Sequence, residues 1–220
     1  MELVITMGML SLLTFLLFSA FELGTRVFRD TTVRQDTENQ LRAIKLLLER
    51  DANHTNVWNC NENGLPRTVN VGGTDYNRDA LAMSALDDWE APANYDTLTY
   101  RPIWNRYIVW YATLESPTGA LYRQVVDPPV PAGGFITPYA ALGMNINEDP
   151  SLNADVVYSR PLSEDVIDFT TNVLFTDGTI QTSIRLKASG TSTRPGTMVR
   201  TEENLQVDFM FQPKNSWPQI

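Results

Sequence analysis

The chain has very few residues of the types that bind metals or activate nucleophiles. Its 220 residues include one cysteine, Cys60, and one histidine, His54. A single cysteine excludes an intrachain disulfide, and one cysteine with one histidine cannot supply the ligands of a typical zinc site. A Ser-His-Asp triad would depend on His54, which lies where a long helix is expected to end. We therefore predict that the protein is not an enzyme and uses no cofactor.

Charge, proline and glycine are scarce near the N-terminus. Glu2 is the only charged residue before Glu22, the first 65 residues contain no proline, and the glycines up to residue 63 are Gly8 and Gly24. The intervening residues 3–21 are apolar throughout, apart from a few hydroxyl side chains. As a helix they are about 28 Å long, close to the ~30 Å thickness of a bilayer's hydrocarbon core. This segment is predicted to cross a membrane.

Two other interpretations of the apolar segment are a secretory signal peptide and a plain membrane anchor. The signal peptide fits poorly, because no Lys or Arg precedes the apolar run and a small-x-small cleavage pattern is missing. The plain anchor stays open. Arg26, Arg29 and Arg34 follow the segment, which by itself favours a cytoplasmic C-terminal domain. A basic leader before Met1 would remove this conflict, and we expect one.

Helical periodicity continues beyond the apolar segment. Apolar side chains and one threonine recur at spacings of three and four residues, which places them on one helix face. This stripe consists of Val33, Thr37, Leu41, Ile44, Leu47 and Leu48. We predict one helix from Glu2 to about Asp51, about 75 Å long. Residues 1–24 would be its membrane part, and residues 25–55 an amphipathic part that packs on a sheet.

Residues 56–220 are expected to form a globular domain with an antiparallel sheet. A short helix is predicted over residues 78–89, where apolar residues fall at helical spacing. β-Branched and aromatic residues predict strands over 106–114, 120–126, 165–175, 179–188 and 205–211. Residues 116–119 and the Asp177-Gly178 dipeptide predict hairpin turns. The predicted fold class is α+β, with a long N-terminal helix on an antiparallel sheet.

The N-terminal pattern resembles the type IV pilin and pseudopilin superfamily. In that family a basic leader is removed, the new N-terminus is methylated, and a glutamate at the fifth mature position precedes an apolar helix, much as Glu2 does here. Three residues and a leader would then precede Met1. The strand motifs Val109-Trp110-Tyr111 and Leu121-Tyr122-Arg123, with the closing Phe211–Asn215, are similar to those of J-type minor pseudopilins of type II secretion and related minor pilins.

This resemblance implies a pilin-like fold and a structural function. The chain would be a minor subunit, assembled from the inner membrane into a type IV pilus or a pseudopilus, near its tip. Glu2 would neutralise the N-terminal ammonium of a neighbouring subunit. The expected partners are other pilin or pseudopilin subunits, the inner membrane and, if a leader exists, a prepilin peptidase. The globular domain would be periplasmic or otherwise extracytoplasmic. The alternative is a single-pass, membrane-anchored β domain that binds a ligand or surface and never polymerises.

Three residues of the globular part are candidate calcium ligands. Asp75, Asn77 and Asp79 have the D-x-N-x-D spacing of a calcium loop. Ala80 occupies the glycine position of that loop and Leu86 the position of its bidentate acid, so capping of the predicted helix by Asp75 or Asn77 is favoured. Some pseudopilins bind calcium, which keeps the three residues as candidates.

The formal net charge of −9 disfavours nucleic acid as a partner. Basic and aromatic residues nevertheless alternate in one stretch as they do in single-strand binders: Tyr100, Arg101, Trp104, Arg106, Tyr107, Trp110 and Tyr111. Strand alternation would send half of these rings into a core, so we expect no nucleic-acid partner unless the filament is a competence pilus. Residues 147–149 with Asp155 form a further acidic loop, expected to be a solvated turn.

Overall fold

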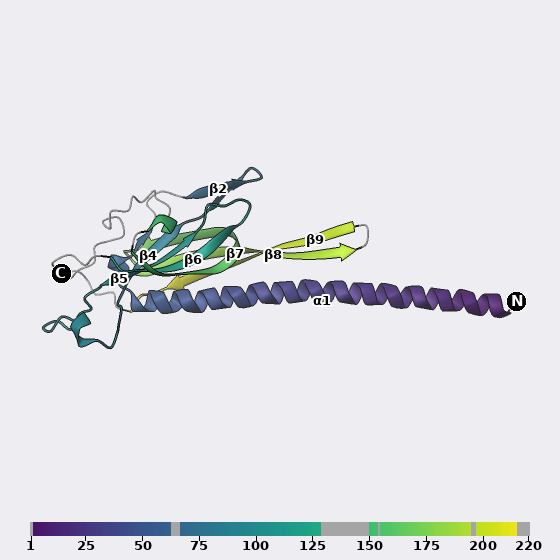
Figure 1. Ribbon diagram of the computed structural model, residues 1–220, viewed down its shortest axis with the longest axis horizontal. Coiled ribbons are helices and arrows are strands. Elements are labelled where there is room, and N and C mark those ends of the chain that lie inside the picture. The colour runs from purple at the N-terminus through teal and green to yellow at the C-terminus, as the bar shows by residue number, and fades with distance from the viewer. Residues whose placement is uncertain (1, 63–66, 129–149, 154, 195–196, 215–220) are drawn as a thin grey trace.

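The computed structural model describes residues 2–62, 67–128, 150–153, 155–194 and 197–214. One long helix, α1 (Glu2–His54), lies along an antiparallel sheet and extends far beyond it (Figure 1). The N-terminus is at the free end of α1, and the globular domain lies along the other half of the helix. The architecture is therefore α+β, as predicted.

Helix α1 has 53 residues, which makes it about 80 Å long. It runs without a break across residues 24–25, where the sequence pattern changes from apolar to amphipathic. Most of the predicted stripe is buried: Thr37, Leu41, Ile44 and Leu48 lie in the interface with the sheet, and Leu47 is partly buried. The helical periodicity thus correctly identified the packed face of α1.

Seven strands of the described chain form one sheet, in the order β1-β4-β5-β6-β7-β8-β9, with every neighbouring pair antiparallel. The strands are β1 (Asn61–Glu62), β4 (Ala80–Ala85), β5 (Arg106–Ala112), β6 (Gly119–Val126), β7 (Val156–Leu174), β8 (Thr179–Arg194) and β9 (Thr197–Phe211). A separate hairpin contains β2 (Thr68–Val71) and β3 (Thr74–Asn77). Short 3-10 turns are η1 (Val57–Asn59), η2 (Pro92–Asn94) and η4 (Pro150–Leu152).

The helix predicted over residues 78–89 is wrong, because this segment contains strand β4. All six residues of β4 are buried. Leu81 and Met83 face the core under α1, whereas Ala80 and Ala82 face a second core on the opposite side of the sheet. A strand covered on both faces is apolar at nearly every position and shows no alternation. Such a short apolar run cannot be distinguished from a buried helix by periodicity.

The five predicted strands are confirmed, and the last three are longer than expected. Strand β7 begins at Val156, and β8 and β9 run well past the main sheet as a hairpin that extends along α1 toward its free end (Figure 1). The predicted turn at Asp177-Gly178 joins β7 to β8, and Gly178 adopts a positive φ of 65°. The turn over 116–119 joins β5 to β6. The Thr and Ser residues in the extended hairpin are compatible with strands. They give little alternation of apolar and polar residues, so the sequence pattern did not predict the full length of these strands.

Two hydrophobic cores lie on the two faces of the sheet. The larger core is between the sheet and α1 and includes Ile44, Leu48, Trp110 and Phe169. The second core is on the opposite face, where segment 86–105 packs over β4 and β5 through Leu86 and Trp104, with Trp89 and Tyr95 partly buried beside them. Segment 86–105 is thereby attached to the sheet face that α1 does not cover.

Candidate functional site

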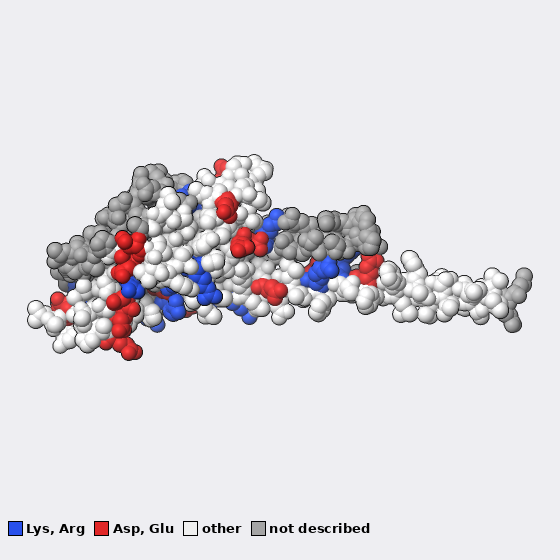
Figure 2. All heavy atoms as spheres, viewed as in Figure 1, with Lys and Arg blue, Asp and Glu red and all other residues white. Residues whose placement is uncertain are grey.

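The N-terminal half of α1 exposes apolar side chains on all sides. The large apolar residues from Leu3 to Phe21 are between 56% and 75% exposed. None of the most apolar 18-residue window is buried within the protein, and the helix is long and apolar enough to cross a membrane. Figure 2 shows the described side chains of this half as a rod without charges, followed by acidic and basic groups where the globular domain begins. A surface of this kind must be covered by lipid or by another apolar surface.

Three hydroxyl side chains of this apolar half are bonded to the helix itself. Thr6 donates to the carbonyl of Leu3 at 3.0 Å, and Thr14 donates to that of Leu10 at 2.8 Å. Ser11 donates to carbonyls three and four residues earlier, each at 3.0 Å. These polar groups therefore need no water and no partner from outside the helix, which suits both hydrocarbon and a packed helix interface.

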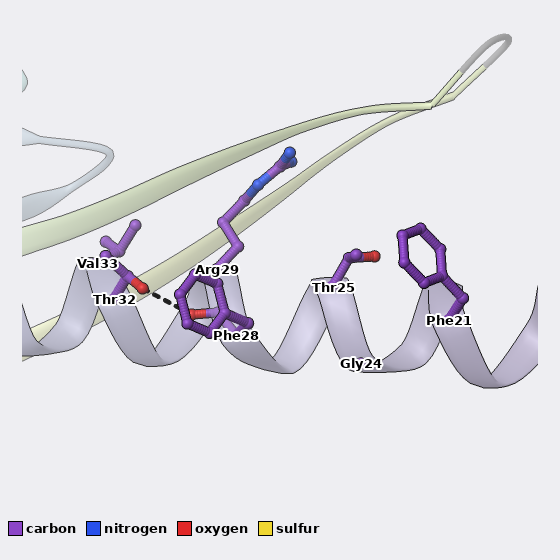
Figure 3. Close-up of a pocket in the computed structure, with 7 residues that line it drawn as sticks. All are labelled: Phe21, Gly24, Thr25, Phe28, Arg29, Thr32 and Val33. Carbon is purple, nitrogen blue, oxygen red and sulfur yellow. Dashed lines mark hydrogen bonds between the residues drawn. The ribbon is translucent and has the colours of Figure 1, made fainter.

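An open recess borders the apolar half on the domain side. It has a volume of about 540 Å³ and lies where α1 passes beneath the β8–β9 hairpin (Figure 3). Arg29 extends from α1 toward the backbone of that hairpin, and Phe21 and Thr25 lie on the same side of the helix. The residues that line the recess are Phe21, Gly24, Thr25, Phe28, Arg29, Thr32 and Val33. Its apolar wall continues the exposed surface of α1 into the domain.

The opposite end of α1 is fixed to the sheet through Asp51. This carboxylate is 3% exposed. Its Oδ2 accepts hydrogen bonds from Nε of Arg123 at 2.6 Å and from Nε1 of Trp110 at 3.1 Å, and its Oδ1 accepts from Nη2 of Arg123 at 3.0 Å. The bidentate geometry orients both groups and compensates the buried charge. One helix residue is thus bonded to both β5 and β6.

These observations define a helix that is anchored at one end and exposed at the other. No protein-family model, curated protein or solved structure matches this chain.

Glu2 is the first residue of α1. Its backbone belongs to the helix, whereas its side chain lies outside the described part of the structure. The assembly role predicted for Glu2 stays a prediction. The free end of α1, where Glu2 begins the helix, lies far from the globular domain (Figure 1).

Of the calcium candidates, Asp75 and Asn77 lie in β3, and Asp79 lies just before β4. Asp75 accepts a hydrogen bond from the side chain of Asn70 at 2.6 Å. Asp79 accepts from the backbone N–H of Thr171 at 2.9 Å, and its own N–H donates to the carbonyl of Phe169. These two carboxylates serve different elements, the β2–β3 hairpin and β7.

Asn77 is bonded to β7 as well. Its N–H donates to Asp168 at 2.8 Å, and its side-chain amide donates to Thr170 at 3.2 Å. The helix-capping role predicted for Asp75 or Asn77 is wrong, because the segment that follows them is strand β4 and not a helix. Within the described ranges, no group of three His, Cys, Asp or Glu side chains is arranged to hold a metal ion. Of the second acidic loop, residues 147–149 lie outside the described residues.

The single cysteine is buried and chemically quiet. Cys60 is enclosed in the core between α1 and the sheet, and its thiol donates to the carbonyl of Asn56 at 3.4 Å. Burial raises the pKa of this thiol from its ordinary value of 9.0 to about 12, partly offset by a hydrogen bond with Thr55. The thiol is therefore protonated at neutral pH, where it acts as a small apolar side chain.

The aromatic residues that resembled a single-strand binder belong mainly to the two cores. Trp104, Tyr107, Trp110 and Tyr111 are buried, so their rings are not available for stacking on bases. Tyr100 is the exception and is exposed.

The sequence reasoning missed the Asp51–Arg123 pair, because these residues are 72 positions apart and no local pattern links them.

Proposed function

We propose that this chain is a minor pilin or pseudopilin, a pilin-like structural subunit that is held in the inner membrane and then assembled near the tip of a filament. The observation that carries this proposal is the form of α1. One unbroken helix has an apolar half that is exposed on all sides and a second half that is packed on an antiparallel sheet. The function is assembly rather than catalysis.

The exposed half requires a covering, and the proposal supplies two in succession. Burial of a large aliphatic or aromatic side chain contributes about 1.5–3 kcal/mol, so this surface cannot remain in water. Lipid covers it before assembly, and the helices of neighbouring subunits cover it in the filament. Because Thr6, Ser11 and Thr14 bond to backbone carbonyls, the helix exchanges one apolar surrounding for the other without losing hydrogen bonds.

Glu2 is the residue to which we assign the alignment of neighbouring subunits. A carboxylate in an apolar surrounding is costly unless a positive group neutralises it. The N-terminal ammonium of an adjacent subunit is such a group, and a charge-assisted bond between the two favours one axial stagger over the others. The partners in this proposal are other pilin or pseudopilin subunits, with a prepilin peptidase acting earlier on any leader.

A pair of matched variants tests the proposal. We expect Glu2→Gln to reduce incorporation into sheared filaments at least tenfold, because an amide cannot form the charged pair. The control is Glu22→Gln, which removes the acid at the other end of the apolar segment. It should leave incorporation within twofold of the wild type. The measurement is the ratio of subunit in the sheared fraction to subunit in the membrane fraction, by quantitative immunoblot.

Two outcomes would contradict the proposal. Wild-type incorporation of Glu2→Gln would remove the alignment role from Glu2. Complete retention of the wild-type chain in the membrane fraction, with none in filaments, would replace the filament subunit by the plain anchor, an extracytoplasmic β domain that does not polymerise.

A further inference from the structure

Segment 86–105 projects from the globular domain at the end opposite the free end of α1 (Figure 1). It connects β4 to β5 and contains η2. No part of the filament proposal uses it. Its inner side packs over the sheet through Trp104, whereas residues 97–101 are all exposed.

The tip of this segment presents two apolar side chains to solvent. Leu98 is 88% exposed and Tyr100 is 80% exposed, the highest values among the large apolar side chains of the described residues. A single exposed apolar residue is ordinary on a protein surface. Here two such residues lie at one tip, and both are more exposed than any large apolar residue in the apolar half of α1. They form a candidate contact site for another molecule.

The tip is held in one conformation by hydrogen bonds to Asp96. Its Oδ1 accepts from the backbone N–H of Leu98 at 3.0 Å, and from the N–H and hydroxyl of Thr99 at 2.7 and 2.8 Å. The N–H of Tyr100 donates to the carbonyl of Asp96 at 2.8 Å, and the N–H of Asp96 donates to the carbonyl of Arg101 at 2.9 Å. Tyr100 adopts a φ of 55°, a left-handed conformation that is costly for a tyrosine.

The base of the segment is equally well bonded. Asp87 accepts from the side-chain amides of Asn94 and Asn105 at 2.6 and 2.7 Å. The hydroxyl of Tyr95 donates to the carbonyl of Trp89 at 2.8 Å. Trp89 in turn packs edge-on against buried Trp104, with ring centroids 6.0 Å apart. The two tip residues therefore stand on a preorganised support, which lowers the entropic cost of binding.

The surroundings of the tip are acidic. Segment 86–105 carries four acids, Asp87, Asp88, Glu90 and Asp96, and one basic residue, Arg101. Hydrogen bonds from Asn105 and Thr99 lower the pKa of Asp87 and Asp96 respectively, so both are charged at neutral pH. Figure 2 shows acidic groups gathered at this end of the globular domain. Phosphate-rich surfaces are repelled by such a field, and basic ones are attracted.

We propose that this tip is a docking site for another protein, whose apolar pocket receives Leu98 and Tyr100 and is rimmed by Lys and Arg side chains. Anionic lipid is the wrong partner, because the tip is acidic and lies at the end of the molecule opposite the apolar half of α1. Nucleic acid is excluded by the same charge. The site functions whether or not the chain polymerises, so its test is independent of the filament test.

The first experiment identifies the partner in the cells that produce the protein. The photo-crosslinker p-benzoylphenylalanine replaces Tyr100 in the full-length chain, and in a matched control it replaces Leu152, which is 73% exposed elsewhere on the domain. We expect one discrete protein adduct from position 100 that is missing from position 152. No adduct at position 100, or an adduct with lipid, nucleic acid or a second copy of this chain, would overturn the proposal.

The second experiment measures binding of the identified protein to the purified full-length chain in detergent. Leu98→Ala and Tyr100→Ala should each raise Kd about tenfold or more, as truncations of central anchor residues do. Leu152→Ala should change Kd less than twofold. Asp88→Lys and added salt should both slow association. Equal Kd values for the tip variants and the Leu152 control would refute the site, and matching thermal unfolding midpoints establish that each variant is folded.

Discussion

Asp51 connects residues that are distant in the sequence. The carboxylate is bonded to Trp110 and Arg123, 59 and 72 positions away. From the sequence Asp51 was expected to mark the end of the helix, and α1 does end three residues later, at His54. Its partners were not predictable, because a buried ion pair across elements depends on strand register, which no helical periodicity specifies.

At the scale of single residues, we predict that Asp51→Asn is strongly destabilising. The variant leaves the guanidinium of Arg123 partly buried without its counter-charge, and removal of one partner of a buried pair costs about 3–5 kcal/mol. Denaturant unfolding of the detergent-solubilised protein, followed by tryptophan fluorescence, gives the free energy of unfolding.

The matched control is Glu38→Gln. Glu38 pairs with Arg34 at 3.1 Å on the exposed side of α1, and such surface pairs contribute about 0–1 kcal/mol. Equal losses of stability for Asp51→Asn and Glu38→Gln would show that the Asp51 pair does not fasten the helix.

At the scale of elements, sequence patterns succeeded where one face of an element is buried and the other is exposed. Helix α1 between Thr37 and Leu48 has this property, and its buried face was predicted correctly. Strand β4 is covered on both faces, so its pattern lacked the alternation that identifies strands, and a helix was predicted instead. The recess beside α1 was not predicted, because it depends on how far β8 and β9 extend.

Neighbouring positions on α1 provide the element-scale prediction. Ile44 is 1% exposed in the core, so Ile44→Ala should lower the free energy of unfolding by about 2–5 kcal/mol. Leu46 is 66% exposed on the other side of the same helix turn, so Leu46→Ala should change it by less than about 0.5 kcal/mol. Chemical denaturation compares the two, and similar losses would mean that α1 packs on the sheet by another face.

At the scale of the whole molecule, the apolar half of α1 requires a covering of lipid or of another apolar surface, whereas the globular domain has hydrophobic cores of its own. Composition alone predicted the membrane-spanning character of residues 3–21, and the role of Glu2 came from a family resemblance. In the loop tip, Leu98 had no sequence signal, and Tyr100 was singled out only as a member of the stretch in which basic and aromatic residues alternate. The tip lies in a turn-rich stretch whose exposure depends on how segment 86–105 packs on the sheet.

Removal of the apolar half tests whether the globular domain folds independently of it. A chain that begins at residue 25 loses helix residues of which none between 3 and 24 is buried, so its free energy of unfolding should match that of the full chain within about 1 kcal/mol. It should be a monomer in buffer without detergent, whereas the full chain should require detergent or lipid. Light scattering after gel filtration measures the mass, and aggregation of the shortened chain would contradict the prediction.

The unbroken course of α1 also determines how mechanical load enters the domain. A pull on the free end of the helix is transmitted along about 80 Å of continuous hydrogen-bonded backbone. It reaches the domain at the interface of Leu41, Ile44 and Leu48 and at the Asp51–Arg123 pair. Because β8 and β9 run roughly along the helix axis, this force acts as shear on their ladder (Figure 1). In shear many backbone hydrogen bonds share the load at once, so the geometry of the domain favours resistance to unfolding when force is applied through the helix.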